Sequence, residues 1–465
     1  MLALKNKLNM KNKFLSCMLF ATATMAMVSC SKKEDAKIST PPFQIGQPVS
    51  DATPLTGSIK GTMLTGKTYT ISGDVTVNEG DTLLLQKGVK IYMTNNADVI
   101  VKGTLLSLGT KDQPNYFTVE DKTKSSDPNL NPIDDNAYKG LWTGINCDVT
   151  CKLLVLKWTH IEFGGGVYTN PPVEGTKAND NSFVVLFQNT DGVFVMEDSW
   201  VYGSIDDPIR LKGGKFNLMR NTFEKCGFTG GDVMNAKSGS VGNMAYNLVI
   251  GAATTGTKAS NKGGTPIQCN VNMYNNTYVN NGYRRVESGR GGSINYEEGA
   301  RGKAYNNLIV DCRFGFRVVG DPLADTTNLS YGNTFSYNTS LETANEIYPT
   351  GYITKPQTND VPMASSFLPA NYTLGAIYNG AAVVGKNDPM FVNYSLPQTN
   401  FKKIASVGVY DFHLKSNSPC AGKGLTSALT ALNVVPVDPN FGSSEITPPG
   451  KDIGAFQLDG TGNQH

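Results

Sequence analysis

The chain is poor in the residue types on which many kinds of site depend. It has three histidines in 465 residues, which leaves little for histidine-based catalysis or metal binding. It has no Cys-x-x-Cys pair, so a zinc site is not expected. Charged residues make up 17% of the chain, and the formal net charge of +2 provides no broad basic field for nucleic acid. We therefore expect no metal site and no nucleic-acid partner.

The N-terminus has no apolar run long enough for a membrane-spanning helix, which needs about 20 residues. Its uncharged stretch, residues 14–28, follows four lysines and ends at Val28-Ser29-Cys30, which resembles the lipobox of bacterial lipoproteins. This resemblance implies a signal peptide over residues 1–29 and lipidation of Cys30. An ordinary secretory signal with a chance cysteine is the alternative. The four lysines account for the positive formal charge, so a chain cut before Cys30 carries about −2.

The segment after Cys30 is rich in Pro, Thr, Ser and Lys, and we expect residues 30–60 to form a flexible tether. Its start, Ser31-Lys-Lys-Glu-Asp35, resembles the short charged export tags of Bacteroidetes surface lipoproteins. The expected location is therefore an outer membrane, reached through the lipid anchor. The sequence leaves open whether the protein faces the cell surface or the periplasm.

One phrase returns five times between residues 216 and 341. Each copy is a short run of β-branched, aromatic and aliphatic residues around one asparagine, as in Met273-Tyr-Asn-Asn276-Thr-Tyr. The asparagine recurs at intervals of 26, 29, 31 and 31 residues, a period typical of stacked units that share one core. Trp158 and Asp198 occupy the asparagine position in two earlier, weaker copies. We expect the asparagines to form a hydrogen-bonded ladder at one bend of the chain, with these members: Asn221, Asn247, Asn276, Asn307 and Asn338.

The repeat predicts an all-β protein with the architecture of a parallel β-helix, a single-stranded solenoid. The 49 glycines and the clean alternation of apolar and polar residues over 73–120 fit short strands separated by turns. Short strands at this spacing would also suit a β-sandwich, but the later repeat favours the solenoid. We expect the β-helix to span residues 61–457, followed by a disordered tail over 458–465.

Four motifs near the end agree with this prediction: Asn387-Asp-Pro389-Met-Phe391, Asp411-Phe-His-Leu414, Ser418-Pro419 and Asp452-Ile-Gly-Ala-Phe456. With the repeat, they resemble the pattern that closes right-handed parallel β-helices of the pectate-lyase-like superfamily, and more narrowly Bacteroidetes β-helix lipoproteins. The resemblance covers roughly residues 60–457 and implies a right-handed helix. It implies no single activity, because this scaffold hosts lyases, hydrolases, adhesins and inert spacers.

One acidic pattern is similar to the catalytic motifs of polygalacturonases, which are inverting glycosidases of this fold. Asn189-Thr-Asp191-Gly precedes Asp206-Asp207, and inversion requires two carboxyl groups ~6.5–9.5 Å apart. Asp191 and Asp206 are only 15 residues apart, less than one turn of the solenoid, and the family's Gly-His-Gly and Arg-Ile-Lys elements are absent. We therefore expect turn-forming asparagine and aspartate here.

A cluster of charge between the third and fourth ladder asparagines, Asn276 and Asn307, is the better candidate site. Residues 283–303 contain eight charged residues, which are named below. They also contain Gly289, Gly291 and Gly292, which let a backbone approach a ligand closely. The β-helix polysaccharide lyases use an arginine or lysine as base and carboxylates to hold Ca²⁺, so these residue types would suit such an enzyme. A solvated, salt-bridged loop is the plainer alternative. Seven of the charged residues are the candidate glycan-binding set: Arg284, Arg285, Glu287, Arg290, Glu297, Glu298 and Arg301; Lys303 is the eighth charge.

We expect a lipid-anchored surface protein that binds polysaccharide. The enzyme alternative is a lyase of uronate-containing glycans, favoured over a glycosidase, and a third possibility is an adhesive or spacing structure. No catalytic residue is assigned, and no cofactor is expected apart from the Ca²⁺ that a lyase would bring. An exposed file of Trp or Tyr would favour binding, and a carboxylate cluster with a free Lys or Arg would favour a lyase.

Overall fold

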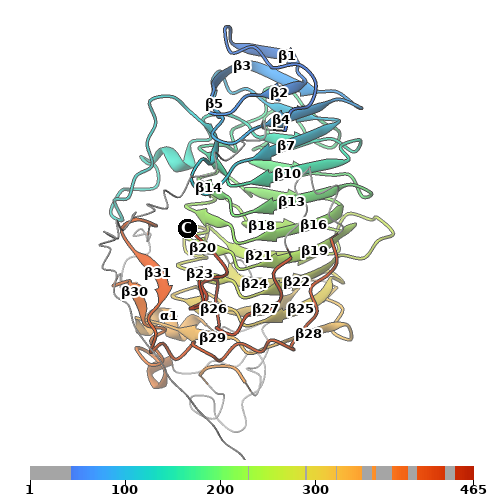
Figure 1. Cartoon of the computed structure of the whole chain (residues 1–465). Coiled ribbons are helices and arrows are strands. Elements are labelled where there is room, and N and C mark those ends of the chain that lie inside the picture. Colours follow the sequence, from blue (N-terminus) through green and yellow to red (C-terminus); the bar gives the residue numbers. More distant parts are fainter. Residues whose placement is uncertain are drawn as a thin grey trace, which may run out of the picture. The chain divides into compact units, whose positions relative to one another are not determined.

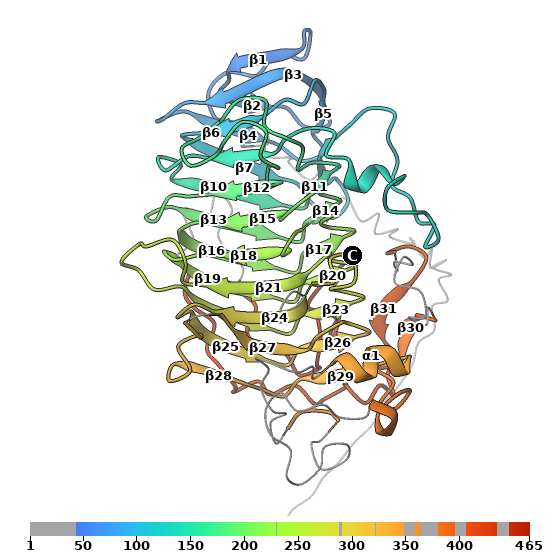
Figure 2. The same ribbon diagram turned by 180° about the vertical axis from the view of Figure 1, so that it is seen from behind.

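The computed structural model describes residues 43–228, 230–287, 291–320, 322–347, 359–362, 380–395, 406–434 and 446–465. Over these residues the chain is a parallel β-helix, which confirms the predicted fold class (Figures 1 and 2). Strands from successive turns stack in layers and pair in parallel, in one ten-stranded and one 19-stranded sheet. None of the helices in these ranges combines the length and apolar character needed to cross a membrane.

Each turn of the β-helix contributes strands to three faces. Face 1 is the ten-stranded sheet: β2 (Gly61–Met63), β4 (Thr82–Leu85), β7 (Thr104–Leu108), β10 (Leu153–Lys157), β13 (Val193–Glu197), β16 (Gly214–Met219), β19 (Ser240–Ala245), β22 (Asn270–Tyr274), β25 (Arg301–Tyr305) and β28 (Leu329–Gly332). Face 2 comprises β5 (Lys90–Met93), β8 (Asn115–Thr118), β11 (Thr159–Glu162), β14 (Trp200–Tyr202), β17 (Thr222–Glu224), β20 (Leu248–Ile250), β23 (Thr277–Val279), β26 (Leu308–Val310) and β29 (Phe335–Tyr337). Face 3 comprises β6 (Val99–Val101), β9 (Ile145–Cys147), β12 (Val185–Phe187), β15 (Ile209–Leu211), β18 (Met234–Ala236), β21 (Thr255–Ser260), β24 (Gly292–Glu297) and β27 (Phe316–Val319).

The first strands close the N-terminal end of the solenoid. β3 (Thr68–Val77) pairs with β5 at its start and with β6 at its end, which joins faces 2 and 3 into the 19-stranded sheet. β1 (Leu55–Ser58) pairs with β3 and covers it. Ordered structure therefore begins inside the segment expected to be a tether, because the backbone groups of β3 need a partner on this side.

The core lies inside the three faces and follows from the alternation of side chains along each strand. On β16, Phe216 and Leu218 point inward and have no exposed area, whereas Lys215 beside them is exposed. Phe223 on β17 and Met234 on β18 complete this turn of the core. Because every strand is short and every turn repeats this pattern, one continuous apolar column runs through the solenoid.

The repeat asparagines lie at the bend between faces 1 and 2. The Oδ1 atom of Asn276 accepts hydrogen bonds from the backbone N–H and the Nδ2 of Asn247, both over 3.0 Å, and Nδ2 of Asn276 donates to the carbonyl of Met244 over 2.9 Å. The same contacts join Asn221 to Asn247 and Asn276 to Asn307. All four asparagines are fully buried. Each amide therefore satisfies polar groups of the preceding turn and of the following one, which a buried bend requires.

The residue before each ladder position adopts a left-handed backbone conformation. Its φ is 51° at Asn275 and 59° at Asn306, where asparagine tolerates this region well. It is also 59° at Arg220 and 56° at Tyr246, where the conformation is costly for the residue type. The chain thus turns between two faces within two residues, and the ladder amides hold the turn in place.

The expected place of Asn338 in the ladder is wrong. Leu308 on β26 pairs with Phe335 on β29, so Thr334 lies opposite Asn307, and Asn338 follows the strand instead of preceding it. The Oδ1 of Asn338 has no hydrogen-bond partner within the described ranges. The fifth phrase resembles the others because its asparagine also follows a strand. That strand is β29 on face 2, whereas the ladder asparagines follow strands of face 1.

The positions assigned to Trp158 and Asp198 are wrong by one residue. Both have positive φ and precede the bend position, which Thr159 and Ser199 occupy. The backbone N–H of Ser199 donates to Oδ1 of Asn221 over 3.0 Å, so the column continues there with a hydroxyl in place of an amide. The copies that contain Trp158 and Asp198 do match the pattern of the repeat. Only the register of strand pairing shows which of two neighbouring residues enters the bend.

Face 2 is covered along much of its length. The loop of residues 121–139 lies against it through Lys225, whose ammonium group is 2.7 Å from Asp135 and 2.8 Å from the carbonyl of Ser125. Further along, the antiparallel pair β30 (Phe391–Asn393) and β31 (Asp411–Leu414) packs Phe391, Phe412 and Leu414 onto the strands, beside α1 (Leu341–Glu346) (Figure 2).

The last residues do not form the disordered tail that was expected over 458–465. Nδ2 of Asn463 donates to the carbonyl of Asn221 over 3.0 Å, and the ring of His465 packs against Trp158, His160 and Trp200. This segment supplies hydrogen bonds and aromatic contacts to the outside of the bend, which explains why a polar, glycine-containing sequence is ordered here. His160 is a packed residue, and burial lowers its pKa to about 3.

The six described cysteines are buried free thiols: Cys147, Cys151, Cys226, Cys269, Cys312 and Cys420. Among the described residues, the first turns of face 3 are covered by an insertion. There the hydroxyl group of Tyr168, in the insertion of residues 164–183, donates to Oδ1 of Asn146 on β9 over 2.7 Å. Beyond this insertion, face 3 carries the hollow described below.

Candidate functional site

Residues 283–303, expected to form one charged loop, do not lie together. Residues 283–287 belong to the connection between strand β23 on face 2 and strand β24 on face 3. Residues 292–297 are strand β24 on face 3, and residues 301–305 are strand β25 on face 1. Arg301 and Lys303 therefore lie on a different face from Glu297 and Glu298. The seven candidate residues do not form one site, because the segment that holds them crosses a corner of the solenoid.

Arg284 is a structural residue. Its guanidinium group donates to the carbonyl oxygens of Gly227, Gly251 and Cys226, over 2.9, 2.6 and 2.6 Å, and stacks 4.6 Å from the ring centre of Tyr138. These carbonyls belong to turns between faces 2 and 3, and the guanidinium group satisfies several of them at once. Arg284 is therefore not available for the expected role in glycan binding, since its side chain is enclosed and its Nε, Nη1 and Nη2 atoms all donate to carbonyl oxygens.

The remaining candidates are placed as follows. Arg285 lines a cleft on face 3 and forms an ion pair of 3.0 Å with Glu287, whose side chain is largely exposed. Glu297 and Glu298 line the same cleft. Arg290 lies outside the described residues, as does Cys30, the expected lipidation site.

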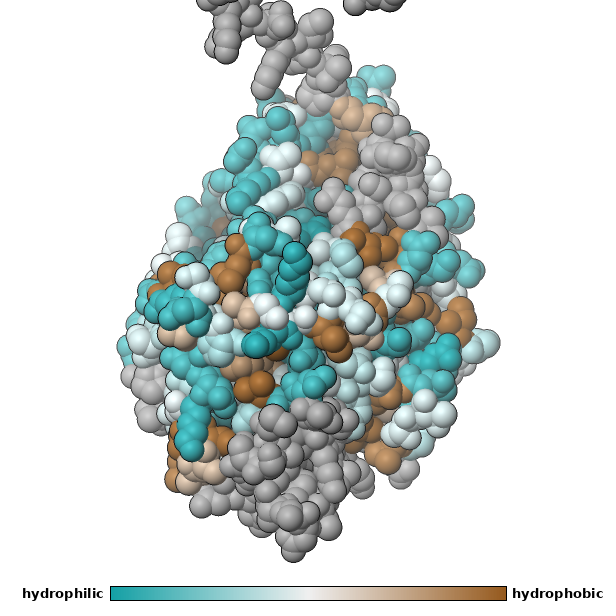
Figure 3. Space-filling view, turned by 60° about the horizontal axis from the view of Figure 1, so that its bottom comes forward, coloured by the Kyte–Doolittle hydropathy of each residue, from teal (hydrophilic) through white to brown (hydrophobic). Residues whose placement is uncertain are grey.

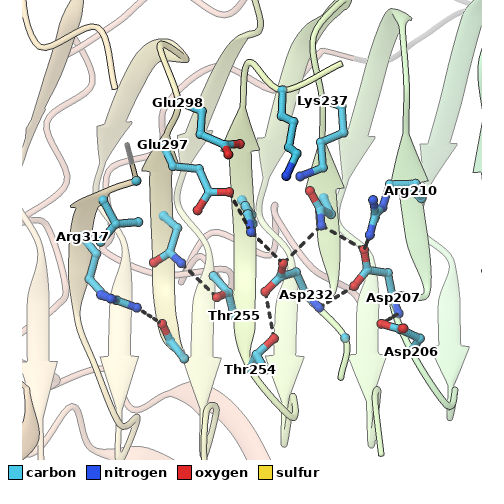
Figure 4. A pocket seen from close by; sticks show the side chains of 18 of the residues that line it. Asp206, Asp207, Arg210, Asp232, Lys237, Thr254, Thr255, Glu297, Glu298 and Arg317 are labelled. Carbon is cyan, nitrogen blue, oxygen red and sulfur yellow. Dashed lines mark hydrogen bonds and ion pairs between the residues drawn. The ribbon is translucent and has the colours of Figure 1, made fainter. Parts of the chain in front are cut away.

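The cleft on face 3 has a volume of about 530 Å³ and crosses the turns from β15 to β27 (Figure 4). Its wall toward face 2 carries Asp206, Asp207 and Asp232, and its wall toward face 1 carries Lys237 and Lys262. Eleven of its lining residues are charged: Asp206, Asp207, Arg210, Asp232, Lys237, Lys258, Lys262, Arg285, Glu297, Glu298 and Arg317.

The floor of the cleft is one column of outward side chains at paired positions on successive strands. Arg210 on β15 pairs with Asn235 on β18, Asn235 with Lys258 on β21, and Lys258 with Asn295 on β24. Arg317 on β27 ends the column. Strand pairing sets neighbouring members about 4.8 Å apart along the solenoid. The floor is therefore a row of polar groups with the regular spacing of a sheet.

Aspartates in the connections between faces 2 and 3 neutralise this row. Asp207 accepts from Nε of Arg210 over 2.8 Å and from Nδ2 of Asn235 over 2.9 Å. Asp232 accepts from Asn235 over 3.1 Å and lies 3.2 Å from the ammonium group of Lys258, which is also 2.8 Å from Glu297. The dashed lines of Figure 4 follow this chain of contacts. Contacts within the protein therefore hold these charged groups in their orientation before any ligand binds.

The electrostatics of the floor match its geometry. Burial alone would raise the pKa of Asp232, but the charge of Lys258 and the hydroxyl of Thr254 hold that pKa well below its usual range. Burial alone would lower the pKa of Lys258, yet Asp232 and Glu297 raise that pKa above its ordinary value. The floor therefore keeps its charged form across the neutral range.

The wall toward face 1 is different, because its cations have no such partner. Within the described ranges, no carboxylate lies within 4.0 Å of the ammonium group of Lys237 or of Lys262. Burial lowers the pKa of Lys237, and the positive charges of Lys258 and Arg210 lower it further, which outweighs the opposite effect of Glu297 and Asp232. Cations that depress one another's pKa create a positive potential, and that potential favours an anion.

The opposite wall holds an acid that is easily protonated. Burial raises the pKa of Asp206 to about 6, and the neighbouring Asp207 contributes to the increase. Gly230 leaves room here, since a Cβ at this position would lie 3.0 Å from the Arg285 side chain and 3.1 Å from that of Asp206. The cleft thus has an acidic wall with a weak acid and a basic wall with free ammonium groups.

A second hollow of about 720 Å³ continues the cleft toward the N-terminal turns. It shares Arg210, Lys237 and Lys262 with the cleft and extends to Lys212 and Val149. The lysines at this corner, at residues 212, 237 and 262, belong to three successive turns. The cationic side therefore extends along the solenoid for longer than the cleft alone.

The polygalacturonase-like pattern does not form an acid pair in the structure. Asp191 is exposed in a turn, where its backbone N–H donates to Oδ1 of Asn189 over 2.9 Å, as expected for turn-forming residues. Asp206 and Asp207 line the cleft, and Asp191 does not. Within the described part of the chain, no group of three or more His, Cys, Asp or Glu side chains is arranged to hold a metal ion.

Sequence reasoning missed Asp232, Lys237, Lys258 and Lys262. The floor column follows the ladder asparagines at 14, 11, 19 and 10 residues, because the turns between faces 2 and 3 differ in length. A period that changes at every turn hides a column that strand pairing makes regular. Comparison of the chain with protein-family models, curated proteins and solved structures gives no match.

Proposed function

We propose that the cleft on face 3 binds an acidic polysaccharide and that the protein is a binding module. The observation that carries the proposal is the pair of ammonium groups of Lys237 and Lys262, which face the cleft without a carboxylate partner in the described residues. Lys237 is partly buried, and burying part of a lysine beside other cations is unfavourable unless an anion compensates it. Lys262 is exposed and adds a second positive charge at the rim of the cleft. A carboxylated or sulfated glycan supplies such anions along an extended chain.

The lining of the cleft supports an acidic ligand over a neutral one. No aromatic side chain is among its lining residues, so the stacking of sugar rings on Trp or Tyr has no platform here. On the surface seen in Figure 3, hydrophobic residues are scattered among hydrophilic ones. Charge and hydrogen bonding would therefore provide most of the affinity, and binding should weaken as salt increases.

A second candidate function, β-elimination of a uronate polymer, is favoured by the combination expected of a lyase, since the described lining residues of the cleft include carboxylates and unpaired lysines and no aromatic residue. The cleft combines a lysine of lowered pKa, Lys237, with a carboxyl group of raised pKa, Asp206. Elimination requires a base for the proton next to the uronate carboxyl group and an acid for the leaving oxygen. The Ca²⁺ implied by the resemblance to lyases does not fit this cleft, because Asp207, Asp232 and Glu297 already bind Arg210, Asn235 and Lys258. No step of the proposal uses Ca²⁺.

We further propose that the protein is a lipoprotein of the pectate-lyase-like superfamily, anchored in a Bacteroidetes outer membrane through Cys30. The motif Val28-Ser29-Cys30 supports the anchor, and the parallel β-helix is compatible with the superfamily. Cys30→Ala should leave the protein unprocessed or released from membranes. Processing that is insensitive to globomycin, with no lipid found by mass spectrometry, would contradict the anchor.

Binding can be tested with two pairs of lysines. The double variant Lys237→Ala/Lys262→Ala should lose retention on immobilised polygalacturonate, and its melting curve should stay close to that of the unchanged protein. The control is Lys215→Ala/Lys303→Ala, which removes the same charge from exposed positions on face 1. Equal losses in both pairs would indicate nonspecific attraction and would contradict a site in the cleft.

The same polymer distinguishes the two candidate functions. Release of unsaturated uronate ends, followed by ultraviolet absorbance, would establish the lyase, and its loss in Lys237→Ala would assign the base. Retention without release is the result that we expect. Absence of both retention and release, with every acidic glycan tried, would favour the spacer.

A further inference from the structure

We infer that Asn235 selects, among acidic polymers, those that carry a hydroxyl group close to the acid. The inference rests on the proposed function, because it concerns the same cleft, and it names a specificity-determining residue within it. It starts from Asn235 Oδ1, a buried acceptor in the floor that has no hydrogen-bond partner in the described residues.

The orientation of the Asn235 amide is fixed by its neighbours. Its Nδ2 donates to Asp207 over 2.9 Å and to Asp232 over 3.1 Å, and both partners are carboxylates. A carboxylate only accepts, and the lowered pKa of Asp232 keeps that group ionised. Turning the amide over would place its oxygen against two carboxylates, so Nδ2 must face them. The Oδ1 atom is therefore held away from the carboxylates.

Asn295, two strands further along the floor, shows why this matters. Its Nδ2 lies 3.0 Å from the hydroxyl oxygen of Thr255, and its Oδ1 also lacks a partner among the residues that the structure describes. A hydroxyl group both donates and accepts, so the Asn295 amide can turn over and offer either atom. The Asn235 amide cannot turn over, so it can offer a ligand only its Oδ1 atom, which accepts a hydrogen bond.

The Asn235 side chain is 1% exposed, so its free oxygen is costly unless a donor reaches it. Lys237 follows two residues later on the same edge, about 7 Å along the extended chain. A ligand whose anionic group binds Lys237 thus places its neighbouring atoms over Asn235. A hydroxyl group there completes the floor, whereas a bare polyanion leaves the oxygen unsatisfied. A site built around a hydrogen bond discriminates strongly against analogues that lack the donor.

The test compares two polymers on the full-length protein by calorimetry at one salt concentration. Polygalacturonate carries hydroxyl groups beside its acid groups, and polyacrylate carries acid groups alone. The unchanged protein should bind polygalacturonate more tightly per acid group by about tenfold, the value of one satisfied hydrogen bond. Asn235→Leu should reduce this ratio to near one, and because it also removes the donor to Asp207 and Asp232, both polymers should bind more weakly. Asn235→Asp keeps an acceptor if its carboxyl group holds a proton toward Asp207 and Asp232, as the two neighbouring carboxylates favour, and it should retain a preference even if both affinities fall.

The outcomes separate this inference from the proposed function. Suppose that both polymers bind through Lys237, but either the unchanged protein shows no preference or Asn235→Leu keeps the preference. Asn235 then has no role in selection, and the binding proposal stands. If neither polymer binds, or if Lys237→Ala has no effect, the proposed function fails first. A melting curve accompanies each variant. If Asn235→Leu does not fold, the preference of the unchanged protein and that of Asn235→Asp still decide the question.

Discussion

The Oδ1 atom of Asn276 lies 3.0 Å from the backbone nitrogen of Asn247, one turn of the solenoid away. This contact shows how a bend can be buried without losing its hydrogen bonds. The backbone N–H at the bend is aimed along the solenoid axis, where no strand partner exists, and the side chain of the next turn supplies the acceptor. Repetition of one residue type is therefore a structural requirement of the bend.

The first prediction concerns this ladder. Asn276→Ala removes an acceptor for two donors of Asn247 and leaves the Met244 carbonyl without its amide donor. We expect a loss of about 1–3 kcal/mol in the free energy of unfolding, measured by denaturant titration. Asn338→Ala is the matched control, because Asn338 is also buried but its Oδ1 has no partner in the described chain. A larger loss for the control would contradict the ladder.

Much of the fold could be predicted because it repeats. The spacing of Asn221, Asn247, Asn276 and Asn307 reports the length of each turn, and the apolar runs around them report the strands. Asn338 shows the limit of that reasoning. Its phrase has the right composition, but a shift in strand pairing, which involves residues of the previous turn, decides which residue enters the bend.

The candidate site was predictable only in part. High charge density drew attention to residues 283–303, and Arg285, Glu297 and Glu298 do line the cleft. Charge density cannot distinguish them from Arg284, which satisfies backbone carbonyls. That distinction depends on the turns of two preceding layers. The floor residues were hidden for the same reason, since they come from several turns with unequal loops.

The second prediction follows from the different surroundings of two adjacent arginines. Arg284→Ala leaves the carbonyls of Gly227, Gly251 and Cys226 without donors, and we expect a loss of about 3 kcal/mol or more in the free energy of unfolding. Arg285→Ala removes a partly exposed ion pair with Glu287, and we expect less than about 1 kcal/mol. Equal destabilisation by the two variants would contradict the assignment of Arg284 to the turns.

The third prediction concerns stability and pH. Burial raises the pKa of Glu224 to about 7, from an ordinary value of 4.5. Between these pH values the folded chain holds a proton that the unfolded chain has released, so this group lowers stability as pH rises from about 4.5 to 7. Glu224→Gln should therefore gain stability relative to the unchanged protein over this window, with the difference constant above pH 7. Unfolding titrations at several pH values measure it. Asp98, whose pKa burial also raises to about 7, stays in place, so the total slope decreases without vanishing.

The last prediction concerns binding and pH. Burial raises the pKa of Asp206 to about 6; Asp207 and Arg210 also act on it, and Arg285 lies beside it across Gly230. Above pH 6 an ionised Asp206 repels an acidic ligand, and below pH 6 that repulsion is removed while the lysines stay charged. Affinity for polygalacturonate should thus increase by about threefold to fivefold from pH 7 to pH 5, the effect of one partly exposed charge. Asp206→Asn should bind at pH 7 as the unchanged protein binds at pH 5, with little pH dependence. Asp191→Asn, which removes an exposed charge outside the cleft, should keep the full dependence. A dependence that survives in Asp206→Asn would assign the titration to another group and would exclude Asp206 from the ligand's surroundings.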